Sequence, residues 1–131
     1  MPERVRAIFT GALFGLLRQH AGMTQTDLAD AAAVGQSTVC RLEGATATPS
    51  PLTFGYMLGP LGSSPEEFDR LLARVGKRLV GVCARVIPAV DGPWWKRIEA
   101  ATGPASFEVA ARGLITFAAE VVLRGDEAHD R

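Results

Sequence analysis

The sequence predicts an all-α protein, and three observations support this fold class. Apolar residues recur every three or four positions through residues 3–20, 64–87 and 106–125, as they do in amphipathic helices. Thr24 and Ser64 are residue types that commonly cap the start of a helix. A helix-breaking residue ends or follows each of the three stretches: Gly22, Pro88 and Gly125. The apolar share of 47 % is enough to fill a core.

The first helix is expected from Glu3 to His20, because Pro2 suits a helix start and Gly22 suits a helix end. Its apolar residues repeat at three and four positions and predict one buried stripe. The residues of that stripe are Val5, Ile8, Phe9, Ala12, Leu13, Leu16 and Leu17.

Two short helices joined by a tight turn are predicted between Met23 and Gly44. Thr24 caps the first of them, and Asp27 stands where a capping box needs a carboxylate. This helix is expected to end near Ala32 or Ala33, and Gly35 caps the next one, which runs to about Leu42. The residues expected to form a small core are Leu28, Ala29, Val34, Val39 and Leu42. This is the outline of a helix-turn-helix, which places its second helix in the major groove of DNA.

The remaining side chains of the second short helix are expected to face outward: Gln36, Ser37, Thr38, Cys40 and Arg41. Glutamine pairs with adenine, arginine pairs with guanine, and serine or threonine reaches bases or phosphates. Gln25 begins the preceding helix, where its amide and the helix N-terminus suit a phosphate. These residues predict double-stranded DNA as the partner.

The segment TQTDLADAAAVGQSTVCRLEG resembles the helix-turn-helix of the Xre/Cro-like (phage repressor type) transcriptional regulators. The family pattern is roughly T-Q-x-x-L-A-x-x-A-G-V-S-x-x-T-I-S-R-x-E-x-G. The matching residues are Thr24, Gln25, Leu28, Ala29, Ala32, Val34, Thr38, Arg41 and Glu43. The resemblance extends from about Phe14 to Phe68, and it stops there.

This resemblance implies a five-helix repressor-like (Cro/C1-type) domain over residues 1–76 that binds operator DNA. It implies that the helix opened by Gly35 enters the major groove and that the following loop runs beside the phosphate backbone. In that loop Thr46, Thr48 and Ser50 are expected to donate to phosphates, with ordinary turn chemistry as the alternative. Arg18 resembles a family position near the DNA backbone, and a solvated charge is the alternative there.

The segment departs from the family pattern at the two ends of the second short helix. Ala33 replaces the usual turn glycine, and a positive φ there costs alanine about 1 kcal/mol. Gly35 replaces the usual capping serine, Cys40 replaces a serine, and Gly44 with Ala45 replaces Asn-Gly.

Two further helices are expected after the loop. The first lies within the family resemblance, and the second begins inside it and continues past its end at Phe68. Pro51 begins a short helix whose inward residues are expected to be Leu52, Phe54, Tyr56 and Leu58. Gly59-Pro60 must interrupt it. Ser64 caps a long helix to about Ile87, with the apolar seam Phe68, Leu71, Leu72, Val75, Leu79, Val82 and Val86.

Residues 77–125 are expected to form a helical C-terminal extension, followed by a flexible tail over residues 126–131. Trp94, Ile98 and Ala101 predict a short helix. Ser106 precedes a last helix with the stripe Phe107, Ala110, Ala111, Leu114, Phe117, Ala118, Val121 and Val122.

The extension carries more apolar surface than one small domain easily hides, so a homodimer is expected, in keeping with two-fold operators. The residues predicted for its interface are Leu79, Val82, Val86, Trp94, Trp95, Phe117 and Val121. The alternative is that these helices fold back on the N-terminal domain.

Composition bounds the other functions. The 14 basic and 14 acidic residues cancel, which is less basic than is usual for a DNA-binding domain. Cys40 and Cys83 form no metal-ligand pattern with His20 or His129, so neither a metal nor another cofactor is expected. No apolar run is long enough to span a membrane, and a reducing cytoplasmic compartment is expected.

The leading functional prediction is a sequence-specific transcription regulator, most simply a repressor. No set of catalytic residues is apparent, so the protein is not expected to be an enzyme. The runner-up is a protein-interaction module, antitoxin-like or binding a phage or host factor, whose C-terminal helices hold another protein. A third reading is a ligand-sensing switch with a pocket beside Trp94 and Trp95.

Overall fold

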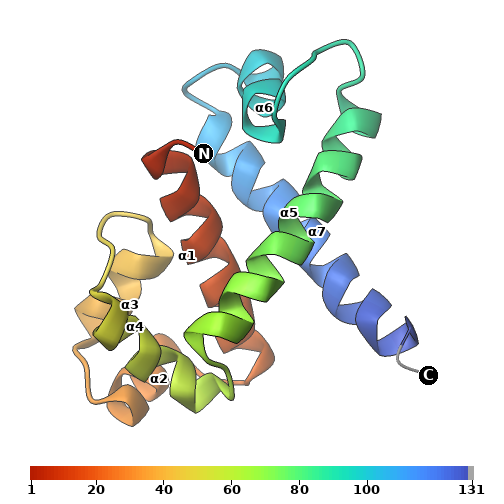
Figure 1. The fold of residues 1–131 in the computed structure, drawn as a ribbon. Coiled ribbons are helices and arrows are strands. Elements are labelled where there is room, and N and C mark those ends of the chain that lie inside the picture. Colours follow the sequence, from red (N-terminus) through yellow and green to blue (C-terminus); the bar gives the residue numbers. More distant parts are fainter. Residues whose placement is uncertain (130–131) are drawn as a thin grey trace. The chain divides into compact units, whose positions relative to one another are not determined.

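All regular secondary structure in the described part of the chain is helical, and no strand occurs there (Figure 1). The computed structural model describes the backbone of residues 1–129 and the side chains of residues 1–125. The elements are α1 (Glu3–His20), α2 (Gln25–Ala32), α3 (Gln36–Glu43), α4 (Pro51–Leu58), the short 3₁₀ turn η1 (Gly59–Leu61), α5 (Pro65–Val86), α6 (Trp94–Thr102) and α7 (Phe107–His129). The predicted all-α fold with a helical C-terminal extension is confirmed.

The chain divides into two compact units, unit 1 (residues 1–71) and unit 2 (residues 72–131). The boundary between them falls inside α5, whereas the sequence predicts it after residue 76. Helix α7 reaches His129, past the end predicted at Gly125. The last two residues of the predicted tail, Asp130 and Arg131, lie outside the described residues.

Helix α1 forms one wall of the core of unit 1. Val5, Ile8 and Leu13 are buried as their spacing predicts, whereas Ala12 and Leu17 are only half-buried. Three further residues of α1 are buried although the apolar stripe does not include them: Gly11, Phe14 and Gly15. The Phe14 ring lies 5.9 Å from that of Phe54, which in turn meets Phe68 edge-on at 5.1 Å. An aromatic cluster therefore joins α1, α4 and the start of α5.

The prediction for the inward face of α4 is wrong at two positions. Leu52 and Tyr56 are 67 % and 60 % exposed, whereas Met57 and Leu58 are buried and Phe54 is half-buried. Residues 54, 57 and 58 share one side of a helix with 3.6 residues per turn, and residues 52 and 56 lie on the other. Apolar residues on both sides of this short helix allow either choice, and packing on Phe14 and Phe68 decides between them.

The two short helices begin as predicted. The Asp27 N–H donates to Thr24 Oγ1 and the Thr24 N–H donates to Asp27 Oδ2, both at 3.0 Å, which completes the capping box. The hydrogen bond from the Thr24 N–H, and next the Thr24 side chain, lower the pKa of the Asp27 carboxyl. Gly35 caps α3 without a side-chain contact, so only α2 has a side chain satisfying its first N–H groups.

Both short helices end on an alanine in the left-handed backbone region. Ala33 has a φ of 57° and Ala45 a φ of 60°. After α2 the Val34 N–H donates to the Ala29 carbonyl, and after α3 the Thr46 N–H donates to the Arg41 carbonyl. These bonds are the six-to-one contacts of the Schellman motif, which favours glycine at the left-handed residue. The strain expected at Ala33 is therefore present, and Ala45 repeats it.

Replacing Ala33 by glycine is expected to raise the free energy of unfolding by about 1 kcal/mol, because glycine adopts this backbone without a Cβ penalty. Ala33 is exposed, so almost no apolar burial is lost. Urea unfolding followed by circular dichroism measures the change. Gly22→Ala is the matched control: it introduces the same strain at a φ of 71°, with open space around the new Cβ, and is expected to destabilise by a similar amount. Equal urea midpoints for Ala33→Gly and the natural chain would show that the left-handed backbone at Ala33 costs no stability.

Unit 2 is built from the rest of α5 together with α6 and α7. Its buried residues are Val75, Leu79, Cys83, Trp94, Ile98, Ala111, Ile115, Ala118, Ala119 and Val122. The Trp94 and Trp95 rings meet edge-on at 5.5 Å. The Arg97 guanidinium donates to the carbonyls of Ile87, at 2.9 Å, and Gly92, at 3.1 Å, and so fixes the loop between α5 and α6.

Three residues of the apolar seam and stripes predicted for unit 2 are exposed within the chain. Val86 and Phe117 are 63 % and 55 % exposed, and Ala101 also faces solvent. On α7 the buried set recurs at three and four residues through Ile115, Ala118 and Val122, and Phe117 lies off that face. Val86 ends α5, one turn beyond the last buried residue, Cys83.

Candidate nucleic-acid interface

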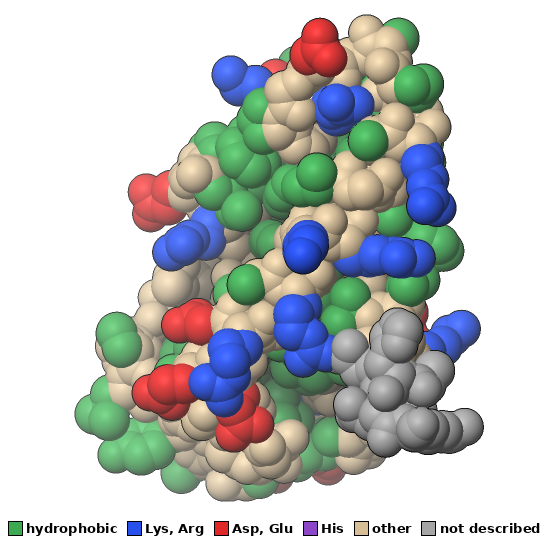
Figure 2. All heavy atoms as spheres, turned by 45° about the vertical axis from the view of Figure 1, so that its right-hand side comes forward, with side chains coloured by type: hydrophobic (Ala, Val, Ile, Leu, Met, Phe, Trp, Pro, Cys, Tyr) green, Lys and Arg blue, Asp and Glu red, His purple; other side chains and the backbone are tan. Residues whose placement is uncertain are grey.

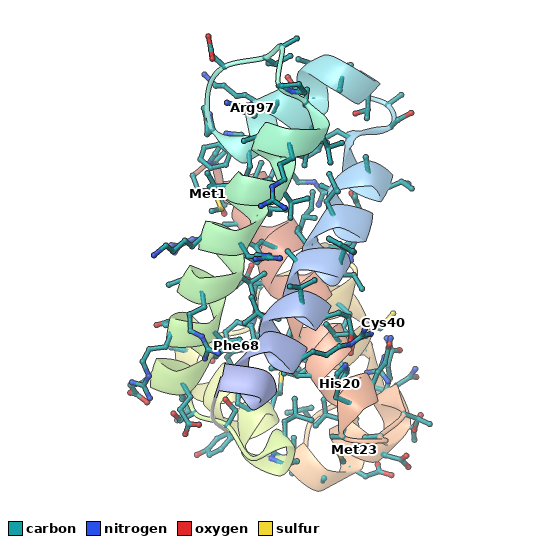
Figure 3. All side chains as sticks on the ribbon, turned by 90° about the vertical axis from the view of Figure 1, so that its right-hand side faces the viewer. Met1, His20, Met23, Cys40, Phe68 and Arg97 are labelled. Carbon is teal, nitrogen blue, oxygen red and sulfur yellow. The ribbon has the colours of Figure 1, made fainter. Side chains whose placement is uncertain are left out.

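Helix α3 presents a polar face and buries an apolar one, as the sequence predicts. Val39 and Leu42 are buried and attach the helix to unit 1. The residues predicted to face outward are Gln36, Ser37, Thr38, Cys40 and Arg41; Thr38 is half-buried and the others are exposed. Cys40, labelled in Figure 3, points away from the helices. The exposed side chains can make the hydrogen bonds that base edges require.

Gln25 and Gln36 are brought together by the turn between α2 and α3. The Gln36 amide nitrogen donates to Gln25 Oε1 at 3.4 Å. The Gln25 amide nitrogen in turn donates to Glu43 Oε1 at 3.2 Å. Gln25 is half-buried at the first position of α2, so its side chain connects the polar face of α3 to the Glu43 carboxylate.

Arg18 and Glu43 form an ion pair that closes this chain of hydrogen bonds. Arg18 Nε lies 2.7 Å from Glu43 Oε2, and its Nη2 donates to Oε1 at 2.9 Å, which is a two-point contact. The third guanidinium nitrogen donates to the Met23 carbonyl at 2.7 Å. Only 12 % and 13 % of the two side chains remain exposed.

Both interpretations of Arg18 from the sequence are therefore wrong: its side chain is neither free to hold a phosphate nor a solvated charge. The hydrogen bond to Glu43 raises the pKa of Arg18, so the charge is held at every physiological pH. The pair links the end of α1 to the end of α3. Glu43, which the sequence matches to the family pattern without indicating a role, is the residue that joins Arg18 to Gln25.

The backbones of α1 and α3 approach closely at Gly11. A Cβ on Gly11 would overlap the Leu42 carbonyl oxygen and lie 2.9 Å from that of Glu43. A Cβ on Gly15 would lie 3.0 Å from Glu43 Oε1, the oxygen that receives Arg18 and Gln25. The absence of side chains at these two positions therefore sets how far α3 stands from α1.

The loop after α3 (residues 44–50) combines structural contacts with exposed hydroxyl groups. Thr46 and Thr48 are exposed, and the Thr46 hydroxyl donates to the Arg41 carbonyl at 3.4 Å. Ser50 instead caps α4: its Oγ accepts the Thr53 N–H at 3.2 Å, so turn chemistry occupies it. Arg4, which sequence reasoning did not select, donates to the Ala45 carbonyl at 2.7 Å and anchors the loop to α1.

The residues predicted for a dimer interface fall into three groups. Leu79 and Trp94 are buried within the chain and present no surface to a second copy. The half-buried residues are Val82, Trp95 and Val121, and the exposed ones are Val86 and Phe117. Of the predicted set, the last two are therefore the most accessible.

The cysteines lie apart, and no group of three or more His, Cys, Asp or Glu side chains suited to a metal lies together within the described residues. Cys40 is exposed on α3 and Cys83 is buried in α5. Burial raises the pKa of the Cys83 thiol, and the charge of Arg97 opposes that shift.

Comparison with known proteins bears on this site. Residues 11–71 match the family model of a helix-turn-helix domain, which covers α2, α3 and the turn between them. Curated proteins and solved structures gave no match to the chain. Over the described residues, no helix combines the length and apolar character needed to cross a bilayer. Residues 11–71 thus match a helix-turn-helix domain, in keeping with the resemblance to the Xre/Cro-like family, and such a domain suggests a DNA-binding regulator.

Proposed function

We propose that the protein is a sequence-specific transcriptional repressor that binds a palindromic operator as a homodimer. The observation that carries this proposal is the exposed polar face of α3, which stands on buried Val39 and Leu42 within a helix-turn-helix domain. A helix supported in this way fits the major groove, and bound repressor would exclude other proteins from the operator.

In this proposal the side chains of α3 read bases: Gln36, Ser37, Thr38 and Arg41. Gln25, the N-terminal end of α3 at Gly35, and the hydroxyl groups of Thr46 and Thr48 hold phosphates. Arg18 is excluded from this set because its guanidinium is occupied by Glu43 and Met23. Its contribution is to hold α2 and α3 in place.

Truncation of the base-reading side chains is expected to weaken operator binding. Arg41→Ala and Gln36→Ala should each cost about 1–3 kcal/mol against a site selected from random DNA, and should relax the preference at one base pair. Gel shifts at fixed salt measure both effects. The matched control is Arg124→Ala, which removes the same charge from an exposed side chain of α7. Unchanged affinity and preference in both α3 variants would refute the base-reading assignment.

Exposed apolar side chains on unit 2 support a homodimer. Val80, Val86, Val109 and Phe117 are all more than half exposed, and all four belong to α5 or α7. Isologous dimers bury such residues against the same residues of a second copy. Two-fold symmetry would place two α3 helices on half-sites separated by about one DNA turn, roughly 34 Å.

Phe117→Asp is expected to convert the dimer to a monomer, because a carboxylate at the centre of an apolar interface is left unpaired. Sedimentation velocity measures the mass in solution. Tyr56→Asp is the matched control, since Tyr56 is similarly exposed at 60 % but lies on α4 of unit 1. If only the Tyr56 variant dissociated, the interface would lie on unit 1. If the natural chain were a monomer, the homodimer in our proposal would be wrong.

A protein-interaction module is the second candidate function, because the exposed apolar residues of unit 2 suit a different protein as well as a second copy. Retention of operator binding by a monomeric natural chain would favour it. We also propose that the protein is not an enzyme and acts in the cytoplasm; both cysteines are free thiols, as a reducing compartment permits.

A further inference from the structure

Five of the 14 basic residues of this neutral chain lie on α5, after its acidic first turn. From residue 70 to residue 86 the helix carries five basic side chains and no acidic one: Arg70, Arg74, Lys77, Arg78 and Arg85. Figure 2 shows Lys and Arg side chains gathered over the middle and right of the face it presents, with no acidic side chain among them. The helix-turn-helix does not account for this charge, since four of the five residues belong to unit 2.

A cavity of about 580 Å³ lies between α5 and α7 within unit 2, beside these charges. Its rim is cationic and consists of Arg74, Lys77, Arg78 and Arg85. Positions 74, 77, 78, 81 and 85 share one helix face, so the cations surround one opening and do not spread around α5. We refer to this space as the basic cavity.

The inner surface of the basic cavity is apolar. Val82 of α5 and Val121 and Val122 of α7 line it, together with Gly81 and Gly125. A Cβ built on either glycine meets no atom within 4 Å, so the two glycines leave the space open. The basic cavity thus combines a hydrocarbon surface with a cationic rim.

No acidic side chain among the described residues pairs with Lys77, Arg78 or Arg85, whereas Arg112 and Arg124 on α7 each have a glutamate partner four residues away. Exposed cations held side by side repel one another, and an anion between them relieves that repulsion.

We propose that the basic cavity binds an amphipathic organic anion, with an oxyanion head at Lys77, Arg78 and Arg85 and a hydrocarbon body on the three valines. Its volume lies within the range of small-ligand pockets. A nucleic-acid backbone is less suited, because a phosphodiester strand has no apolar part to cover the valines. The inference is independent of the proposed repressor function, since none of its residues belongs to the proposed DNA-binding set.

Titration calorimetry on the full chain tests the site. Decanoate and decyl phosphate, each below its micellar concentration, are expected to bind one per chain, and comparing them identifies the preferred head. Decanol, which lacks the charge, and inorganic phosphate, which lacks the body, are expected to bind at least about tenfold more weakly. Equal binding of decanol and decanoate would overturn the proposal, as would competition by a random-sequence duplex that displaces decanoate.

Two variants locate the binding. The double variant Lys77→Gln/Arg78→Gln is expected to weaken decanoate at least about tenfold, and Arg6→Gln/Arg41→Gln, which removes the same charge from unit 1, should not. Gly81→Leu fills the open space without changing the charge and is expected to abolish binding while circular dichroism shows an intact fold. Undiminished binding by both unit 2 variants would show that the anion binds elsewhere. Operator binding by the two unit 2 variants, measured by gel shift, tests the proposed repressor function separately from anion binding.

Discussion

Gly11→Ala is expected to destabilise unit 1 by about 2–3 kcal/mol, the upper part of the range for overpacked sites. The new methyl group would overlap the Leu42 carbonyl oxygen and press on that of Glu43, and both are backbone atoms. A flexible side chain can turn away from a methyl group, but a helix backbone must shift as a whole. The shift separates α1 from α3, so operator affinity should fall together with the free energy of unfolding. Urea unfolding and gel shifts measure the two effects.

Gly113→Ala is the control for this experiment. It makes the same substitution inside a helix, α7, at an exposed position where the added Cβ meets no atom within 4 Å. Alanine has the higher helix propensity, so this variant should be more stable by up to about 1 kcal/mol. If Gly11→Ala behaved like Gly113→Ala, the close approach of α1 and α3 would be absent in solution.

Arg18→Met is expected to destabilise the protein by about 2–3 kcal/mol. It removes the cation from the Glu43 carboxylate, which is only 13 % exposed beside Arg18 and also accepts a hydrogen bond from the Gln25 amide. Breaking a fully buried ion pair costs about 3–5 kcal/mol, and the residual exposure of this pair reduces the expected value. Because Glu43 Oε1 also orients Gln25, the variant should weaken operator binding even though Arg18 contacts no DNA in our proposal.

A double-mutant cycle distinguishes the ion pair from general packing. Arg18→Met/Glu43→Gln removes both charges, so its cost should fall below the sum of the single variants by at least about 1 kcal/mol. Arg124→Met provides the surface reference: its pair with Glu120 leaves the arginine side chain 79 % exposed, and its loss should cost under about 0.5 kcal/mol. Additive effects in the cycle would show that Arg18 and Glu43 act independently.

Local sequence signals predicted most of the helix boundaries. The capping box of Thr24 and Asp27 involves residues three positions apart, so its geometry is contained in the sequence. The bounds of α1 and the break at Gly59-Pro60 follow equally from short-range patterns. The inward face of α4 does not, because apolar residues on both sides of this short helix leave two faces to choose from. The choice depends on Phe14 and Phe68, which are distant in sequence.

The candidate site also combines features that local sequence predicts with features that depend on residues distant in the sequence. The exposed face of α3 follows from the helical period of Val39 and Leu42. The role of Arg18 does not, since its partner lies 25 positions away and a lone arginine on a helix carries no sign of it. Gly11 and Gly15 were missed for a related reason: apolar periodicity counts side chains, and these positions contribute by having none. The basic cavity required α5 and α7 to be placed side by side.

The hydrogen bond between Gln36 and Gln25 has a consequence for the thermodynamics of recognition. A glutamine on a protein surface ordinarily samples many rotamers, and fixing one on a base costs about 0.5–1.5 kcal/mol. Here the Gln36 amide already has a partner, and that partner is held by Glu43. In the proposed operator complex, part of the conformational entropy is thus lost when the chain folds and not when Gln36 meets DNA, which lowers the entropic cost of the base contact.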